Sequence, residues 1–190
     1  MRVLLADDHP VVCLSWNDAL AYLKWLNGKA AGKNFRLLSE AEWEFAARAG
    51  KGAKRYPWGD DLNASDQCVH ANGLDGAARQ QVAWAAGFAV ASCNDGHAYT
   101  APAAALRPNG FGLHHMHGNA WEWVQDQWHD NYNGAPADGS AWTSGGDQAR
   151  RVRRGGSWGG TPRNLRSAIR SGDAPDTRND NTGFRIARTY

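Results

Sequence analysis

The three cysteines are the side chains in this sequence best suited to redox or metal chemistry, and their spacing argues against both. Cys13, Cys68 and Cys93 form no Cys-x-x-Cys pair and no set with metal-ligand spacing. Cys13 lies in the apolar run 11–14, which predicts a buried, unreactive thiol. Cys68 and Cys93 could bridge, but the odd number of cysteines and the lack of a secretory leader in the first residues leave that pairing open.

A histidine-rich run is the second candidate for chemistry. His114, His115 and His117 stand close together, and imidazole is a good ligand for zinc, copper and nickel. If the run is extended, His115 and His117 point to the same side of the strand. By itself the run leaves a transition-metal site open.

Arginines form the only dense run of charge, at positions 150, 151, 153 and 154. If Val152 faces the core, we expect the flanking arginines on the opposite face, exposed or paired with acids. The formal net charge is only +2, so a dedicated nucleic-acid binder is not expected. No apolar run approaches the ~18 residues of a membrane span, so none is expected either.

Two helices are predicted to position these residues in the first third of the chain. Ser15 begins a segment with apolar residues at helical spacing, and Gly28 closes it. Ser39 and Glu42 form a capping box for a second helix, which Gly50 ends and whose buried face includes Trp43.

Short strands and long ordered loops are predicted for the rest of the chain. From Tyr56 onward, glycine, proline, asparagine and aspartate interrupt every apolar run. Val152 and the run 184–186 carry the pattern of strands that flank a long polar excursion. The 190 residues and ten tryptophans therefore predict one α+β domain, residues 1–190, with indoles in a rigid frame.

Four ordered motifs carry a family resemblance: PVVCLSW at 10–16, RLLSEAEWEFAAR at 36–48, NGFGL with HGNAWEW between 109 and 123, and RGGSW with GFR between 154 and 185. Together they resemble the formylglycine-generating-enzyme (sulfatase-modifying factor) domain. The resemblance covers nearly all of the chain. It implies a variant of the C-type lectin-like fold, and histidine before Gly-Asn is ordinary in that family.

The resemblance also implies an enzyme that oxidises a protein cysteine, with two cysteines that bind copper a few residues beyond Gly-Gly-Ser. Gly160 and Leu165 stand at those positions here, and neither residue can replace a thiolate. We therefore expect no copper and no oxidase activity. An oxidoreductase acting on protein cysteine remains the alternative.

Structural calcium is a further implication of the resemblance. The matching positions form two sets, Asn72, Gly73, Asp95 and His97 in the first and Asn119, Ala120 and Glu122 in the second. Carboxylate, amide and carbonyl oxygens on irregular loops suit this cation. At His97 and Ala120 only the backbone carbonyl could serve.

The segment 154–185 resembles the variable region of proteins diversified by diversity-generating retroelements. After Trp158 it contains no Lys, Glu, Gln, Met or Trp up to position 182, and these are the residue types that adenine substitution in an Asn codon cannot produce. Such a region presents adaptable polar groups on a rigid scaffold, as an antibody does. The expected ligand-binding residues are Trp158, Gly159, Gly160, Thr161, Arg163, Ile169, Ser171, Gly172, Asp173, Ala174, Thr177, Asn179, Asp180 and Asn181.

These expectations together favour ligand binding over catalysis. The leading hypothesis is a non-catalytic variable protein that binds a protein or other surface ligand through segment 154–185. We expect its arginines at 166, 170, 178 and 185 to pin loops through carbonyls or through carboxylates such as that of Asp176.

Overall fold

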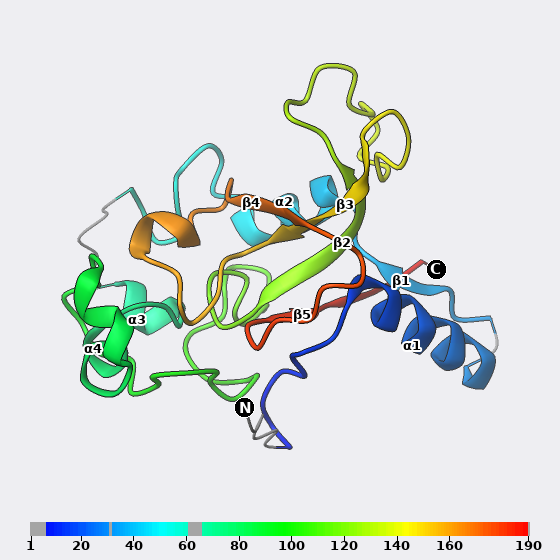
Figure 1. Cartoon of the computed structure of the whole chain (residues 1–190). Coiled ribbons are helices and arrows are strands. Elements are labelled where there is room, and N and C mark those ends of the chain that lie inside the picture. Colours follow the sequence, from blue (N-terminus) through cyan, green and yellow to red (C-terminus); the bar gives the residue numbers. More distant parts are fainter. Residues whose placement is uncertain (1–6, 31, 61–65, 190) are drawn as a thin grey trace.

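The computed structural model describes residues 7–30, 32–60 and 66–189 of the chain. Figure 1 shows its elements, which follow one another as α1 (Trp16–Lys29), β1 (Phe35–Leu37), α2 (Glu40–Arg48), α3 (Gln67–His70), α4 (Gly76–Gln81), the 3-10 helix η1 (Ala83–Gly87), β2 (Trp121–Trp128), β3 (Asp147–Arg154), the 3-10 helix η2 (Pro162–Leu165), β4 (Arg170–Asp173), β5 (Thr182–Phe184) and β6 (Ile186–Arg188). None of the helices in these described residues has the length and apolar character needed to cross a bilayer.

Helix α1 begins as the sequence predicts. The Ser15 side chain accepts a hydrogen bond from the Asp18 backbone, and the Asp18 carboxylate accepts one from Ser15. These bonds satisfy amides that the first helical turn leaves unpaired. The helix continues to Lys29, one residue beyond the expected end at Gly28.

The second predicted helix is α2, and its capping box is confirmed. Ser39 and Glu42 exchange the two hydrogen bonds of that motif, and Trp43 is completely buried. The helix ends at Arg48, because Ala49 adopts a left-handed conformation with φ of 46°. Gly50 follows this cap with φ of 76°, so the glycine that ends the helix is the predicted one.

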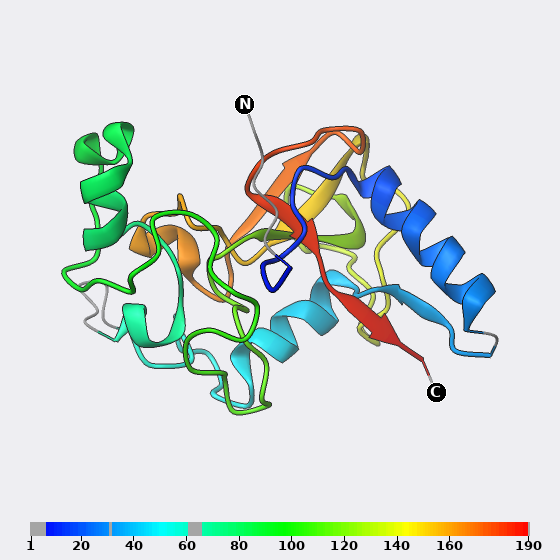
Figure 2. The same ribbon diagram turned by 90° about the horizontal axis from the view of Figure 1, so that it is seen from below.

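Two sheets organise the strands. The larger sheet has the order β4-β3-β2-β5, in which β2 and β5 run parallel and the other neighbours antiparallel. The smaller sheet pairs β1 with β6 (Figure 2). Phe184 ends β5 and Ile186 begins β6, so the single predicted strand is two short ones in different sheets.

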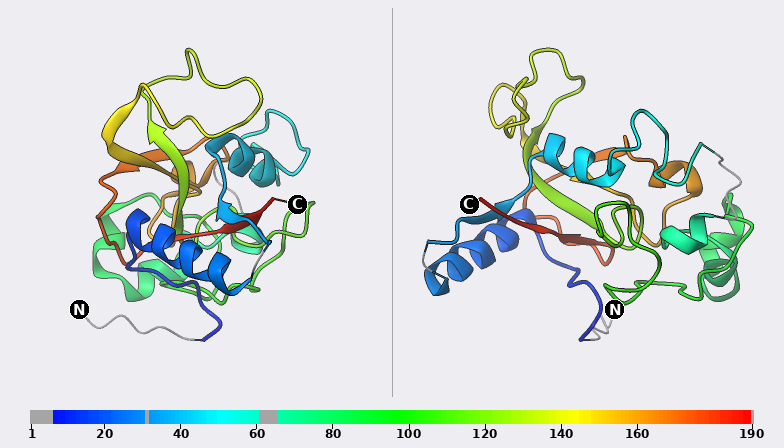
Figure 3. Two further views of the ribbon diagram at one scale, coloured as in Figure 1. Left: turned by 90° about the vertical axis from the view of Figure 1, so that its right-hand side faces the viewer. Right: turned by 180° about the vertical axis from the view of Figure 1, so that it is seen from behind.

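The middle of the chain is more regular than predicted. Short helices α3, α4 and η1 occupy a stretch for which the sequence predicts loops and strands, and they lie at the opposite end of the molecule from α1 (Figures 1 and 2). The Asp75 side chain starts α4 by accepting hydrogen bonds from the amides of Ala77 and Ala78. Strands β2 and β3 have eight residues each, and the loop between them extends from one end of the sheet (Figure 3).

Tryptophans form much of the frame, as the sequence predicts. Trp43 packs with Val124 and Val152 in one core cluster, and Trp123 packs with Leu37 in another. Trp158 is 7% exposed. These large apolar surfaces hold irregular segments in place where regular secondary structure is sparse.

Three arginines of the run pair with acids, which is one of the two predicted arrangements, but Arg153 and Arg154 are buried, at 9% and 0% exposure. Arg151 and Arg153 lie over tryptophan rings, Arg151 over Trp16 and Arg153 over the rings of β2. Arg154 is fully buried, where it pairs with Glu44 and donates to backbone carbonyls. Its side chain is therefore part of the interior rather than of a solvated face.

The cysteines resolve the question that their spacing left open. Cys68 and Cys93 form a disulfide with a Cα–Cα distance of 5.9 Å. Cys13 is a free thiol and only partly buried, with φ of 61°, so the prediction of a buried thiol is wrong. Partial burial and the nearby charge of Asp180 still raise its pKa, which lowers its reactivity.

Candidate ligand-binding surface

The segment 154–185 runs from the end of β3 through η2 and β4 to β5 (Figure 1). Gly155 and Gly156 turn the chain at its start with φ of 96° and 77°. A Cβ atom at Gly156 would lie 2.4 Å from the Asn164 carbonyl oxygen, so only glycine allows the two backbone stretches to approach so closely. The Gly-Gly pair thus fixes the position of η2 against the sheet.

Gly160 and Leu165 meet at the place where the family resemblance expects two thiols. Leu165 is fully buried and packs with Tyr56 and Ala71. A Cβ atom at Gly160 would lie 2.9 Å from Leu165 Cδ2. Packing occupies this position, and the pair offers no soft ligand for copper and no group that could be oxidised.

The predicted ligand-binding residues divide by exposure. Arg163 is exposed, and the predicted residues within 171–181 are partly buried. Ile169 is 8% exposed, so its side chain is buried rather than free to contact a ligand. Trp158 is 7% exposed, and its ring packs against those of Trp84 and Tyr99.

Asp173 ties the first half of the segment that joins β4 to β5. One carboxylate oxygen accepts from the Ala174 amide at 3.0 Å and from the Thr177 hydroxyl at 3.2 Å. The other lies 3.1 Å from Arg153 Nη2 and 3.4 Å from Asn179 Nδ2. These contacts give a polar surface a fixed backbone.

The same connection is also attached to the frame through its backbone. The Pro175 carbonyl accepts from the Asn17 amide at 3.1 Å, and the Asn181 carbonyl accepts from the Trp121 amide at 2.8 Å. Both partners belong to long elements, α1 and β2. Side chains on this connection can therefore change with little effect on its path.

Three of the four expected loop-pinning arginines pair with carboxylates: Arg170 with Glu40, Arg178 with Asp18 and Arg185 with Glu122, each at 2.8 Å. Arg166 instead donates to the Arg163 carbonyl at 2.8 Å. Asp176, the expected partner, contributes its backbone carbonyl to Arg178 at 3.4 Å. The pinning role is confirmed, and the acids come from other elements than expected.

Exposed aromatic rings beside the segment are binding candidates that the sequence does not predict. Trp84, Phe88 and Tyr99 are 48%, 51% and 54% exposed. The rings of Trp84 and Tyr99 lie 6.0 and 5.1 Å from that of Trp158. A Cβ atom at Gly159 would lie 3.2 Å from Trp84, so this aromatic surface adjoins the segment directly. Only tertiary structure brings these distant positions together.

The first calcium set has features that suit a cation. Asn72 Oδ1 and Asp95 Oδ2 are buried and have no hydrogen-bond partner. The Asn72 amide nitrogen donates to the Tyr99 carbonyl at 2.7 Å, which holds the chain at Tyr99, two residues beyond His97, against Asn72. Unpaired buried oxygens cost free energy unless a cation or water satisfies them.

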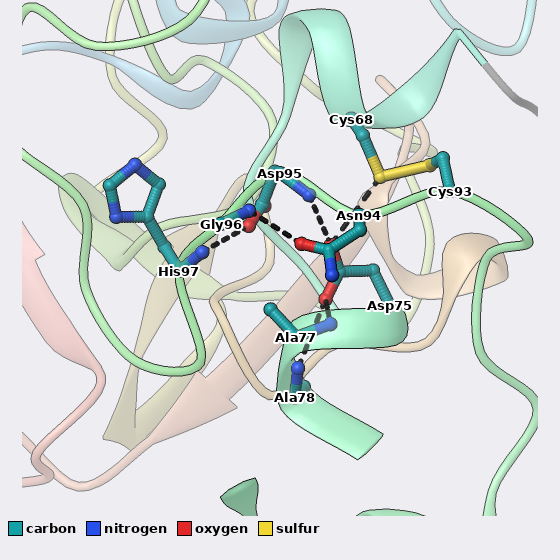
Figure 4. The surroundings of a disulfide bond; sticks show 9 residues. All are labelled: Cys68, Asp75, Ala77, Ala78, Cys93, Asn94, Asp95, Gly96 and His97. Atoms are coloured by element: carbon teal, nitrogen blue, oxygen red, sulfur yellow. Dashed lines mark hydrogen bonds between the residues drawn. A yellow bond between two sulfur atoms is a disulfide. The ribbon is translucent and has the colours of Figure 1, made fainter. Parts of the chain in front are cut away.

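Figure 4 shows how the disulfide holds this loop. Asp75 Oδ2 accepts from the Asp95 amide at 2.6 Å, and the Cys93 carbonyl accepts from the Gly76 amide at 2.9 Å. Burial and the nearby Asp75 charge raise the pKa of Asp95 to about 7. The carboxyl group therefore lies in a place where positive charge would be favourable.

The second calcium set does not fit a cation in this arrangement. Asn119 bonds to both the amide and the carbonyl of Ala101, at 2.8 and 3.1 Å. Glu122 accepts from Arg185 on both oxygens and from the Trp43 indole at 2.7 Å. Ala120 has only its carbonyl to offer, so these residues tie loops to the core.

The histidine run is structural. It is not an extended strand, because His115 has φ of 52°, and His117 is buried beneath η2 with Nδ1 2.7 Å from the Leu165 carbonyl. Burial lowers the pKa of both His115 and His117 to about 4. Within residues 7–30, 32–60 and 66–189, no group of three or more His, Cys, Asp or Glu side chains is arranged to hold a metal ion.

A hollow of about 650 Å³ lies elsewhere on the molecule, between α2 and residues 137–141 of the β2–β3 loop. Arg36, Glu42 and Phe45 are among the residues that line it. It contains no residue of the segment 154–185. Its place is fixed by a hydrogen bond from the Ser39 hydroxyl to the Gly139 carbonyl at 2.7 Å.

Comparisons with known proteins agree with the motifs. Residues 2–190 match the sulfatase-modifying factor enzyme 1-like domain. The formylglycine-generating enzyme of Streptomyces coelicolor is 41% identical over 184 residues, which are 95% of this chain and 52% of that protein. The chain thus spans about half the length of this curated relative.

Solved structures show the same fold. PvdO from Pseudomonas aeruginosa is 39% identical with a TM-score of 0.82, covering 98% of this chain and 64% of that one. Treponema denticola variable protein 1 is 24% identical with a TM-score of 0.71, covering 94% and 70%. The second likeness concerns the fold alone.

Proposed function

The chain belongs to the family of sulfatase-modifying factor enzyme 1-like domains, and from that premise we propose that it is a non-catalytic ligand-binding member. Its binding surface would be the segment 154–185, and the ligand a protein or another surface-displayed molecule. The alternative, an oxidoreductase acting on protein cysteine, corresponds to the names of relatives such as the Streptomyces coelicolor enzyme.

The contact between Gly160 and Leu165 carries this proposal. Thiolates at these two positions would be the metal ligands and redox groups of the family's oxidase chemistry. Instead Leu165 fills the space between Tyr56 and Ala71, and Gly160 has no room for a side chain beside it. Cys13 is the one free thiol of the described residues; its amide donates to the Asn179 carbonyl at 3.0 Å, and no second thiol accompanies it.

Binding is supported by the way the segment combines fixed and adaptable parts. Carboxylate and backbone contacts to α1, α2 and β2 hold its path. Small polar side chains between these anchors are partly exposed, and the aromatic rings of Trp84 and Tyr99 lie beside Trp158 and Gly159 at the start of the segment. A surface of rigid rings and adaptable polar groups resembles an antibody's binding site.

Diversification is the finer part of the proposal. Positions 159–182 hold only residue types that adenine substitution in an Asn codon can give. The fold is also that of Treponema denticola variable protein 1. The decisive observation is a near-copy of the codons for residues 154–185 beside a reverse-transcriptase gene, differing only at adenines. A genome without such a copy would remove diversification and leave a ligand-binding domain of fixed sequence.

The catalytic alternative is tested directly. Purified protein is incubated with copper and a peptide containing Cys-x-Pro-x-Arg, and aldehyde formation is followed by mass spectrometry. We expect no aldehyde, whereas the Streptomyces coelicolor enzyme in a parallel reaction controls for the assay. Turnover by this chain would overturn the binding-protein proposal.

We also propose that calcium, where it binds, occupies the first set alone: Asn72, Gly73, Asp95 and His97. The support is the pair of buried, unpartnered oxygens on Asn72 and Asp95. A cation there would fix the loop that carries Tyr99 at the edge of the binding surface. Its function would be structural.

A further inference from the structure

Most of the arginine charge in the described residues is paired with acids. Carboxylates lie within 4.0 Å of eight arginines, namely Arg36, Arg48, Arg150, Arg153, Arg154, Arg170, Arg178 and Arg185. Arg55, Arg79, Arg107, Arg151, Arg163 and Arg166 have no such partner among the residues that the structure describes. Three of these arginines, Arg55, Arg163 and Arg166, lie together.

The contacts of η2 with the loop after α2 bring them together. The Ser167 amide donates to the Arg55 carbonyl at 2.8 Å, and Arg166 donates to the Arg163 carbonyl at 2.8 Å. The charges of Arg55 and Arg166 both act on the hydroxyl of Tyr56. Figures 1 and 3 show the loop and η2 side by side.

Arg55 and Arg163 are exposed and Arg166 is half-buried. We name these three residues the basic patch. Lys51 and Lys54 are exposed on the same loop as Arg55. Asp60 lies at the rim of the basic patch, where its carboxylate accepts the Arg55 amide at 2.6 Å and pairs with no cation among the described residues.

The basic patch offers concentrated positive charge to a binding partner. Three neighbouring cations with no acid partner among the described residues repel one another in the free protein, and an anion relieves that repulsion on binding. The basic patch adjoins the surface proposed to bind ligand, because Arg163 lies in η2, two residues after Thr161 of that surface. An interaction here would therefore involve the same ligand.

We propose that an acidic stretch of a polypeptide ligand docks on the basic patch. The inference rests on the proposed function and adds the chemistry of the partner. A uniformly anionic polymer such as nucleic acid fits less well, because Asp173, Asp176 and Asp180 occupy the other end of the segment. A polypeptide can be acidic over η2 and neutral or basic beyond it.

The test uses a fluorescein-labelled deca-glutamate peptide and fluorescence anisotropy on the whole chain. The variant Arg55→Gln/Arg163→Gln removes two charges of the patch. The control Lys24→Gln/Lys29→Gln removes two exposed charges from α1, at the opposite end of the molecule. We expect roughly tenfold weaker binding for the first variant, the factor given by two exposed charge pairs, and no change for the second. Binding should also weaken as the salt concentration rises from about 0.05 to about 0.5 M.

Equal effects of the two variants would overturn the proposal, because they would show attraction by net charge alone. So would tighter binding of a single-stranded oligonucleotide of equal charge. Failure here is distinct from failure of the proposed function. If ligands selected against the chain bind through 171–181 but ignore Arg55, only the acidic-partner inference is lost; aldehyde formation in the copper assay would instead remove the proposed function.

Discussion

Replacing Gly160 and Leu165 by alanine, singly and together, tests whether packing has taken the place of chemistry at this site. If the two residues form one packed unit, the cost of Gly160→Ala depends on what stands at 165. The Cβ atom of an alanine at 160 would lie 2.9 Å from Leu165 Cδ2 and 3.0 Å from the Ser157 carbonyl oxygen. Only the first of these contacts disappears when Leu165 is shortened.

The magnitudes follow from burial and contact. Leu165 is fully buried, so Leu165→Ala should lower the free energy of unfolding by about 3 kcal/mol, within the range for such cavities. Gly160→Ala adds a methyl group where none fits and should cost about 1.5 kcal/mol, after the small gain from restricting the unfolded chain. In the double variant the Cδ2 contact is absent, so we expect a total cost of about 3.5 kcal/mol and a coupling of about 1 kcal/mol.

Urea unfolding followed by tryptophan fluorescence measures all four free energies with the disulfide intact. Gly87→Ala is the matched control, because a Cβ atom there meets nothing within 4 Å. Its small effect should add to that of Leu165→Ala. Strict additivity for Gly160→Ala and Leu165→Ala, within about 0.4 kcal/mol, would refute the claim that the two positions pack as one unit.

Three further results are expected. Arg154→Ala should lower the free energy of unfolding by about 3 kcal/mol, because it empties a buried space beside Trp43 and takes a donor from the Ile169 and Ser167 carbonyls, although Glu40 and Glu44 keep Arg170 and Arg48 as partners. Arg178→Ala removes an exposed pair and should cost less than about 1 kcal/mol in the same urea assay. The His117 ring should stay neutral down to about pH 4 in an NMR titration of the folded protein. Because its pKa is about 6.5 in the unfolded chain, the unfolded state binds this proton first, and the protein loses stability as pH falls from about 6.5 towards 4. A titration midpoint of about 6.5 in the folded protein would contradict the burial of this ring. Millimolar calcium should raise the Tm by several degrees, and Asp95→Asn should abolish the rise; an unchanged Tm for the parent chain argues against the first set.

Local chemistry explains which parts of the fold could be predicted. The capping boxes at Ser15 and Ser39 are complete within four residues of sequence, so both helix starts are readable. The helix at Asp75 escapes prediction because its stability comes from outside the segment. Asp75 caps only six residues, and the disulfide and the Asp95 loop hold it in place.

The candidate site, too, could be predicted from the sequence only in part. The missing thiols at 160 and 165 are visible in the sequence, because a residue type either can or cannot ligate copper. Burial of Ile169, exposure of Trp84 and the approach of Arg55 to η2 depend on contacts between distant segments. Composition within one segment carries no signal for such contacts.

The arrangement of charge explains how this surface can vary without losing its fold. The side chains of Arg170 and Arg178 bond to acids on α2 and α1, so most of the contacts that hold the chain path lie outside the adaptable positions, with Asp173 as the exception. At the start of the segment, Gly155 and Gly156 have positive φ angles and close neighbours that leave no room for a Cβ atom, so only glycine fits there. Changes at Thr177 or Asn179 remove at most one hydrogen bond to Asp173, an effect of about 1 kcal/mol. A ligand-binding surface can therefore change its chemistry at these positions while the stability of the domain stays nearly constant.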